Sequence, residues 1–311
     1  MTIARLTSTI LLATLLVTTA LGQQEQTIKV DVDLVNLYLT VCTNKGRLIT
    51  NLDRESFNIF EDGRQQVITH FSRETDVPLT VVLLMDTSGS VADKLRFERD
   101  AIAQFLPTIL RKGRDKAALV TFNHDFELQN DYTDDSSVLT ASLEKIRAGG
   151  GTRLYDALYY VLQEKLSGPE ERKSIILLTD GDDRFSHRSL QDILQLAYRN
   201  NVSIYAISMN NIGRRPSESD LSDQVMRSLG DDTGGMSLFP KNMGKLASHF
   251  ENIGNDLHSK YTIAYRSTNQ EKDGTFRAIR VELNKPHYVV RTRQGYFAPV
   301  QAVAERKSAS K

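Results

Sequence analysis

The sequence predicts an α/β protein in which a doubly wound, mostly parallel sheet is inserted into a β-sandwich-like module. Between residues 78 and 258, apolar strands without alternation are each followed by an amphipathic helix, which is typical of a parallel sheet covered on both faces. Before and after this stretch, short segments alternate apolar with polar residues, as half-buried strands do. Each flanking stretch of about 40 to 46 residues is small for an independent core, so we expect the two to pack together.

Residues 1–22 have the three-part pattern of a secretory signal peptide. Arg5 precedes an apolar stretch, ILLATLLV, and small residues at Ala20 and Gly22 come before a polar segment. The apolar run is shorter than the roughly 20 residues that a membrane-spanning helix needs. We therefore expect cleavage after Gly22 and a mature protein that is periplasmic or secreted, without a membrane span.

Charge and cysteine content exclude several classes of function. The 311 residues contain 39 Lys and Arg and 39 Asp and Glu, so the net charge of zero argues against a general nucleic-acid binder. Cys42 is the single cysteine, so the sequence excludes an intrachain disulfide and a metal cluster held by several thiolates.

The N-terminal segment, residues 23–77, is predicted to be mostly β. Apolar residues alternate from Val35 to Val41 after a one-residue change of phase that indicates a bulge or bend. The sequence Glu61-Asp62-Gly63-Arg64 lies between FNIF and QVITHF and predicts a hairpin turn.

The central segment, residues 78–258, alternates predicted strands with predicted helices. We expect strands at 79–86, 116–122, 174–180, 202–208 and 237–239. We expect helices at about 94–110, 138–146, 154–166, 190–198, 218–230 and 242–258, with a loop between the second strand and the second helix.

The C-terminal segment, residues 259–298, returns to alternation. Strands are expected in YTIAYR, FRAIRVEL and HYVVRTR, and Asp273-Gly274 predicts a turn before the second of them. Residues 299–311 are expected to form a frayed tail.

Polar residues gather at three loops of the central segment. The first predicted strand ends in Asp86-Thr87-Ser88-Gly89-Ser90, and the strand SIILLTD ends in Asp180; Gly149-Gly150-Gly151-Thr152 lies between them. In an open α/β sheet, ligands bind beyond the carboxyl ends of the strands where the strand order reverses. If the loops converge there, two carboxylates and three hydroxyls form an all-oxygen site suited to Mg²⁺, Mn²⁺ or Ca²⁺.

These three loops together resemble the metal-ion-dependent adhesion site of von Willebrand factor type A domains. The matching sequences are DTSGS, GGGT followed by RLYDAL, and LLTDGDD, and the resemblance covers roughly residues 78–258 with a Rossmann-like fold. It implies that Ser88, Ser90 and Thr152 are hydroxyl ligands of a divalent cation.

The resemblance also implies that Asp86 and Asp180 bind the cation directly or through water. An Asp or Glu of a protein partner would then complete the coordination. Related domains move their last helix when the metal loops rearrange; for residues 242–258 such a movement is a hypothesis.

The flanking segments extend the resemblance to nearly the whole mature chain. VDVDLVNLYLTV, FNIFEDG and RTRQGYFAP are similar to segments of exported bacterial proteins described as related to this family. This second resemblance implies no biochemical role.

The leading interpretation is an exported, non-enzymatic adhesion module that binds a metal ion and a protein. One alternative is a Mg²⁺-dependent hydrolase or phosphatase using Asp86, although Ser88 stands where such phosphatases carry their second acid. Another is a structural envelope protein with a vestigial metal site. His124 and Asp125 also suggest a catalytic pair, but neighbours at a strand end are expected to point apart.

Overall fold

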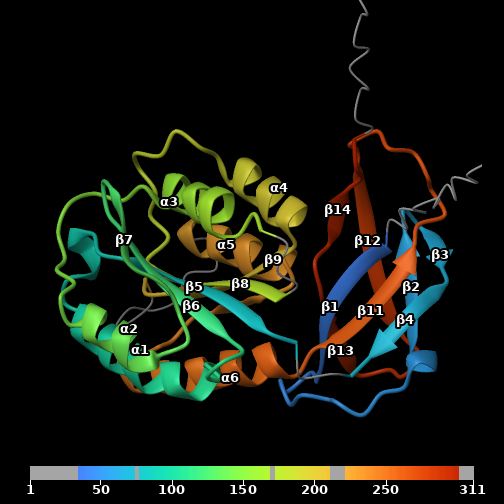
Figure 1. Ribbon diagram of the computed structural model, residues 1–311, viewed down its shortest axis with the longest axis horizontal. Coiled ribbons are helices and arrows are strands. Elements are labelled where there is room, and N and C mark those ends of the chain that lie inside the picture. Colours follow the sequence, from blue (N-terminus) through green and yellow to red (C-terminus); the bar gives the residue numbers. More distant parts are fainter. Residues whose placement is uncertain (1–33, 74–76, 169–171, 211–220, 301–311) are drawn as a thin grey trace, which may run out of the picture. The chain divides into compact units, whose positions relative to one another are not determined.

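The computed structural model describes residues 34–73, 77–168, 172–210 and 221–300 (Figure 1). The predicted signal peptide, residues 1–22, and residues 301–311 of the predicted tail lie outside the described residues. Every helix in the described ranges falls short of the length and apolarity that crossing a membrane requires.

A six-stranded sheet forms the centre of the α/β part, with strand order β10-β9-β8-β5-β6-β7. All neighbouring pairs are parallel except β6 with β7, which confirms the predicted mostly parallel sheet. The bounds are β5 Leu79–Asp86, β6 Lys116–Phe122, β7 Phe126–Thr133, β8 Arg172–Thr179, β9 Val202–Ser208 and β10 Met236–Leu238.

Strand β7 forms where the sequence predicts a loop. Its sequence FELQNDYT holds few apolar residues, and none of its side chains is fully buried. The strand forms because it pairs antiparallel with β6 at the edge of the sheet, where one side needs no apolar cover. Pairing across the sheet therefore overrides the polar local pattern.

Helices cover both faces of this sheet (Figure 1). One face packs on α1 Leu95–Ile109, α2 Ser136–Leu143 and α6 Leu246–His258. The other packs on α3 Leu154–Tyr160, α4 Leu190–Asn200 and α5 Leu221–Arg227. The helix predicted at 154–166 ends in a π-helical turn, Val161–Lys165, and α5 is likewise followed by one, Ser228–Asp232. Short 3₁₀ turns occupy Arg54–Ser56, Gly89–Val91 and Met243–Lys245.

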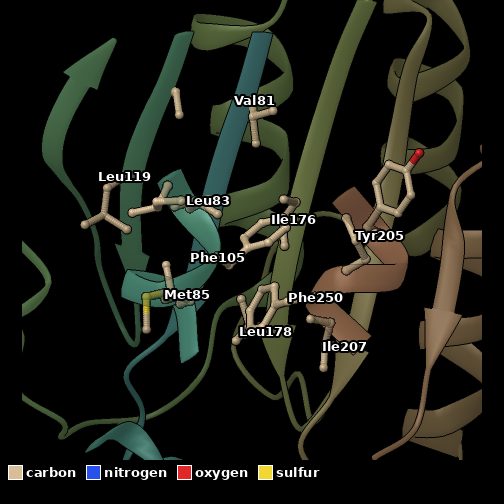
Figure 2. Close-up of a cluster of buried hydrophobic side chains, with 14 of the residues drawn as sticks. Val81, Leu83, Met85, Phe105, Leu119, Ile176, Leu178, Tyr205, Ile207 and Phe250 are labelled. Carbon is tan, nitrogen blue, oxygen red and sulfur yellow. The ribbon is translucent and has the colours of Figure 1, made fainter. Parts of the chain in front are cut away.

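The core under α1 and α6 shows why the strands carry unbroken apolar runs. Figure 2 shows side chains of β5, β6, β8 and β9 pointing toward Phe105 of α1 and Phe250 of α6, whose ring centroids lie 4.7 Å apart. Alternate residues of the same strands enter the core on the opposite face, so nearly every position is buried. Burial at roughly 25 cal/mol per Å² of apolar surface holds the strand ends, and the loops that follow them, in place.

The N-terminal and C-terminal strands fold together into two four-stranded antiparallel sheets, in the orders β13-β1-β11-β4 and β14-β12-β2-β3. Apolar side chains of both sheets form one core, which includes Leu37 and Ile263 of the first sheet and Ile59 and Ile279 of the second. This arrangement confirms the predicted sandwich-like module. The bounds are β1 Leu34–Thr43, β2 Phe57–Glu61, β3 Arg64–Gln66, β4 Ile68–Ser72, β11 Tyr261–Arg266, β12 Phe276–Leu283, β13 Tyr288–Arg291 and β14 Gly295–Phe297.

The second arm of the predicted hairpin is divided between these sheets. β3 pairs with β2 across the turn at Asp62 and Gly63, as expected. After Val67 the chain continues as β4, which pairs with β11 in the other sheet. A strand that changes sheets closes one corner of a sandwich.

Candidate metal centre

Asp86 ends β5 and is fully buried. Its Oδ1 accepts the backbone N–H of Ser88 at 2.8 Å, and its Oδ2 accepts the hydroxyl of Thr179 at 2.6 Å. Because β5 and β8 are parallel neighbours, Asp86 and Thr179 come together at the same edge of the sheet. Hydrogen bonds therefore fix the orientation of both carboxylate oxygens.

Ser88 and Ser90 place their hydroxyls together in the loop after β5. The two Oγ atoms lie 3.0 Å apart, and either one can be the donor. A 3₁₀ turn over Gly89–Val91 bends the chain back so that these alternate residues meet. Ser88 is buried and Ser90 is exposed, so the hydroxyl pair runs from the interior to the surface.

The glycine loop, residues 149–152, packs directly on the loop after β5. The Gly89 N–H donates to the Gly150 carbonyl at 3.1 Å, and the Gly149 N–H donates to the Thr87 carbonyl at 2.7 Å. Gly150 has φ +85°, in the region that side chains disfavour, and an added Cβ would lie 2.6 Å from Nδ1 of His124. The two backbone hydrogen bonds hold the glycine loop, which ends at Thr152, against the loop after β5, and Thr152 is 7% exposed.

The loop after β8 carries Asp180, which is 9% exposed. This loop contacts the glycine loop through the Arg184 N–H, which donates to the Thr152 carbonyl at 3.4 Å. The carboxylate of Asp183 also accepts the N–H of Leu154 at 2.8 Å, at the first residue of α3. Hydrogen bonds thus join all three sequence-predicted loops, although they are far apart in the chain.

The electrostatics of Asp86 fit a bound cation. Burial, with a smaller contribution from the negative charge of Asp180, raises the pKa of Asp86 to about 6, against the hydrogen bonds from Thr179 and Ser88 that lower it. A cation would offset both the burial and the repulsion between the two carboxylates.

The donor chemistry points to hydroxyls as well as carboxylates. Among the described residues, no group of three or more His, Cys, Asp or Glu has the arrangement of a metal site. A cation here would therefore depend on neutral oxygens such as those of Ser88, Ser90 and Thr152, a set that suits hard cations.

Two residues that the motifs did not single out belong to this region. Thr179 immediately precedes Asp180, and a polar residue at the end of an apolar strand is the sequence feature that could have identified it. Glu98 lies on the buried face of α1. Its helical spacing from the apolar residues Leu95 and Ile102 is the sequence feature that could have predicted its burial.

His124 and Asp125 correct one expectation. They lie in the bend between β6 and β7 rather than on a strand, so strand alternation does not separate them. The His124 Nε2 and the Asp125 carboxylate are 3.4 Å apart, with side chains 65% and 81% exposed.

A polar cavity of ≈ 440 Å³ opens beside the loop after β5, next to Thr87. Its remaining lining includes His124, Asp125, Glu127, Lys145 and Arg147. The ring of Phe185 packs against the glycine loop, because a Cβ added to Gly151 would lie only 2.7 Å from Cε2 of Phe185. Phe185 is nevertheless 57% exposed. Polar and apolar surface therefore both border the three loops.

Comparison with known proteins places this region within a described family. The model of the von Willebrand factor type A domain matches residues 80–252. Calcium-activated chloride channel regulator 1 of Bos taurus is 27% identical over 236 residues, which cover 72% of this chain and 24% of that protein. An uncharacterized protein of Synechocystis sp. is 28% identical over 111 residues, which cover 34% of this chain and 26% of that protein. The match therefore spans about a quarter of the length of each of these relatives.

Solved structures show the same fold. The proximal thread matrix protein 1 from the mussel byssus superimposes with a TM-score of 0.51 and 18% identity, covering 64% of this chain and 51% of that chain. A second structure of that protein, with zinc in its metal-ion-dependent adhesion site (MIDAS) motif, gives a TM-score of 0.51 and 17% identity, covering 65% of this chain and 50% of that chain.

Proposed function

The chain belongs to the von Willebrand factor type A domain family, and on that basis we propose that it is an exported, non-enzymatic binding module. In this proposal, a divalent cation at the three joined loops engages an Asp or Glu of a protein partner. The observation that carries the proposal is the hydrogen bonding that joins the three loops beside the buried carboxylate of Asp86.

Five residues would hold the cation: Asp86, Ser88, Ser90, Thr152 and Asp180. Their oxygens suit Mg²⁺, Mn²⁺ or Ca²⁺. When bound, the cation would supply a positive charge that accepts a carboxylate from the partner. The chain's part is to present the oxygens in fixed positions, as the bonds to both Asp86 oxygens already do.

The mixture of carboxylates and hydroxyls favours binding of an anion. Asp86 and Asp180 together balance a double positive charge, whereas the Ser88 and Thr152 hydroxyls add none. The site therefore stays attractive to one more carboxylate, which a set of three or four acidic ligands would repel. A charge-assisted contact of this kind can anchor an interface of modest area.

The surface around the loops offers further contacts to a partner. Phe185 presents an exposed ring beside the glycine loop, and aromatic side chains of this kind are frequent at protein interfaces. The cavity next to Thr87 has room for polar side chains and carries Lys145 and Arg147 in its wall. Both features lie on chain segments adjoining the proposed ligands.

Export is inferred from the sequence of residues 1–22. A charged start, an apolar run and small residues before a polar segment are typical of a secretory signal, so the proposed site of action is the periplasm or the cell exterior. N-terminal sequencing of the protein after expression in an exporting host would test the cleavage after Gly22.

The proposed function is tested first by cation binding. Mg²⁺ and Mn²⁺ are titrated into the purified mature protein by calorimetry, with Thr152→Ala, Thr152→Ser and Ser248→Ala alongside. Thr152→Ala should weaken binding, Thr152→Ser should retain most of it, and Ser248→Ala, an exposed position on α6, should match the wild type. Identical isotherms for wild type and Thr152→Ala would reject the site.

The second test separates binding from catalysis. Proteins captured from the envelope of the exporting cell by the wild type, but lost both with chelator and with Ser88→Ala, would identify the partner. Turnover of a generic phosphatase or esterase substrate that disappears in Asp86→Asn would instead support the hydrolase alternative.

A further inference from the structure

Glu98 is an acid buried in the apolar face of α1. Its neighbours on that face include Leu95 and Ile102, and the residue is 1% exposed. In the part of the chain that the structure describes, neither Oε1 nor Oε2 has a hydrogen-bond partner. A buried carboxyl without partners is costly, so its presence calls for a functional reason.

Glu98 lies in the first turn of α1, which follows directly on the loop after β5, and the buried face of α1 belongs to the same core as Met85, the residue before Asp86. Burial raises the pKa of Glu98 to about 8, and the next cause is the negative charge of Asp86, with a further contribution from Asp180. Lys94 lowers it, but the Lys94 ammonium donates to the Met209 carbonyl at 2.6 Å. The two acids whose negative charge raises the pKa of Glu98 are therefore both proposed cation ligands.

Glu98 does not have the position of a ligand. Among the described residues, no arrangement of three or more acids, histidines or cysteines could hold a metal, so Glu98, Asp86 and Asp180 do not converge on a common point. Its influence on a cation would be exerted through charge, which acts over a longer distance in a buried environment than in water.

We propose that Glu98 strengthens cation binding at the metal centre through its buried negative charge, at the expense of stability in the metal-free protein. This inference rests on the proposed function, because it requires a cation at Asp86 and its neighbours. A bound cation would favour the ionised carboxyl of Glu98, and by reciprocity the ionised carboxyl favours the cation. Without the cation, Glu98 only adds an unpaired acid to the core.

The two effects have opposite signs, which separates this role from ordinary packing. Removing the charge by Glu98→Gln should weaken cation binding and leave the metal-free protein as stable as before or more stable. A packing residue would lose stability on substitution and leave the cation affinity unchanged.

The experiment compares four forms of the mature protein at pH 8: wild type, Glu98→Gln, Asp100→Asn and Ser88→Ala. Mn²⁺ affinity is measured by calorimetry, and Tm is measured in excess chelator. Asp100 is exposed on the same helix, so Asp100→Asn makes the same charge change outside the core. We expect Glu98→Gln to raise the Kd for Mn²⁺ about tenfold without lowering Tm in chelator, and Asp100→Asn to change neither.

Each other outcome overturns the inference in a distinguishable way. Wild-type affinity in Glu98→Gln together with lost binding in Ser88→Ala rejects the role of Glu98 and keeps the proposed function. Absence of Mn²⁺ binding by the wild type rejects both. A lower Tm of Glu98→Gln in chelator assigns Glu98 a packing role. If Glu98→Gln does not fold, Glu98→Met is measured in its place. Failure of both variants to fold also assigns Glu98 a packing role.

Discussion

The hydroxyl of Thr179 donates to the buried carboxylate of Asp86 at 2.6 Å, so side chains as well as backbone join the ends of β8 and β5. The same Thr179 oxygen accepts the Gly181 N–H at 3.1 Å. Thr179 therefore fixes one oxygen of Asp86 and, at the same time, the start of the loop that carries Asp180. Two proposed ligands from different loops depend on one hydroxyl.

Thr179→Val should destabilise the protein and weaken cation binding together. The substitution leaves a buried carboxylate oxygen without its donor, which costs about 1–3 kcal/mol in the free energy of unfolding. Urea unfolding gives the stability, and calorimetry with Mn²⁺ gives the affinity. Thr69→Val is the control, because Thr69 is an exposed strand residue whose hydroxyl donates to a backbone carbonyl. Equal stability of both variants would show that the bond to Asp86 contributes nothing.

Adding a divalent cation should raise the stability of the wild type. At a free Mn²⁺ concentration of about 100 times Kd, ligand binding contributes about 2.7 kcal/mol, which corresponds to a Tm increase of about 5 °C or more. Thermal unfolding with Mn²⁺ and with chelator measures this difference. Ser88→Ala should lose most of it, whereas Ser248→Ala should keep it; the same Mn²⁺-dependent rise in Ser88→Ala would speak against a ligand role for Ser88.

Gly181→Ala should disturb the loop after β8 more than a similar substitution elsewhere. Gly181 has φ +78°, and an added Cβ would meet the Ser222 carbonyl oxygen at 3.0 Å. Gly113 has nearly the same φ, +75°, but nothing within 4 Å of the added Cβ, so it isolates the cost of backbone strain. We expect Gly113→Ala to cost about 1 kcal/mol and Gly181→Ala about 1–2 kcal/mol more, by urea unfolding. A smaller loss for Gly181→Ala than for Gly113→Ala would contradict this packing.

The pH dependence of the metal-free protein should reflect Glu98. Its pKa is raised from 4.5 to about 8 in the folded state, so the folded protein binds the proton more tightly than the unfolded chain. This stabilising contribution is complete below about pH 4.5 and is lost as the pH rises through about 8. In chelator, the difference between the Tm of Glu98→Gln and the Tm of the wild type should therefore increase by about 4 °C in favour of the variant as the pH rises from 5 to 8.5. A Tm difference that does not change with pH would show that Glu98 has an ordinary pKa.

The local sequence pattern was sufficient for most of the fold. Four strands of the central sheet, β5, β6, β8 and β9, and the helices between them follow from apolar runs and helical spacing, because a strand buried on both faces is apolar at most positions. The sandwich strands β11 and β12 were predicted with the bounds that the structure gives, from the alternation of residue types along them. The three polar loops of the candidate site were also visible, because each directly follows or precedes such an element.

Tertiary structure decided the features that depend on partners distant in the chain. β7 is polar, and only pairing with β6 makes it a strand; the segment after Val67 joins the other sheet because β11 is there to pair with it. The bond between Thr179 and Asp86 and the burial of Glu98 near the same acids require β5, β8 and α1 to be packed together. The periodicity of a sequence indicates which face of an element is buried. Strand order and helix packing decide which residues meet that face, and those neighbours determine the electrostatics of the site.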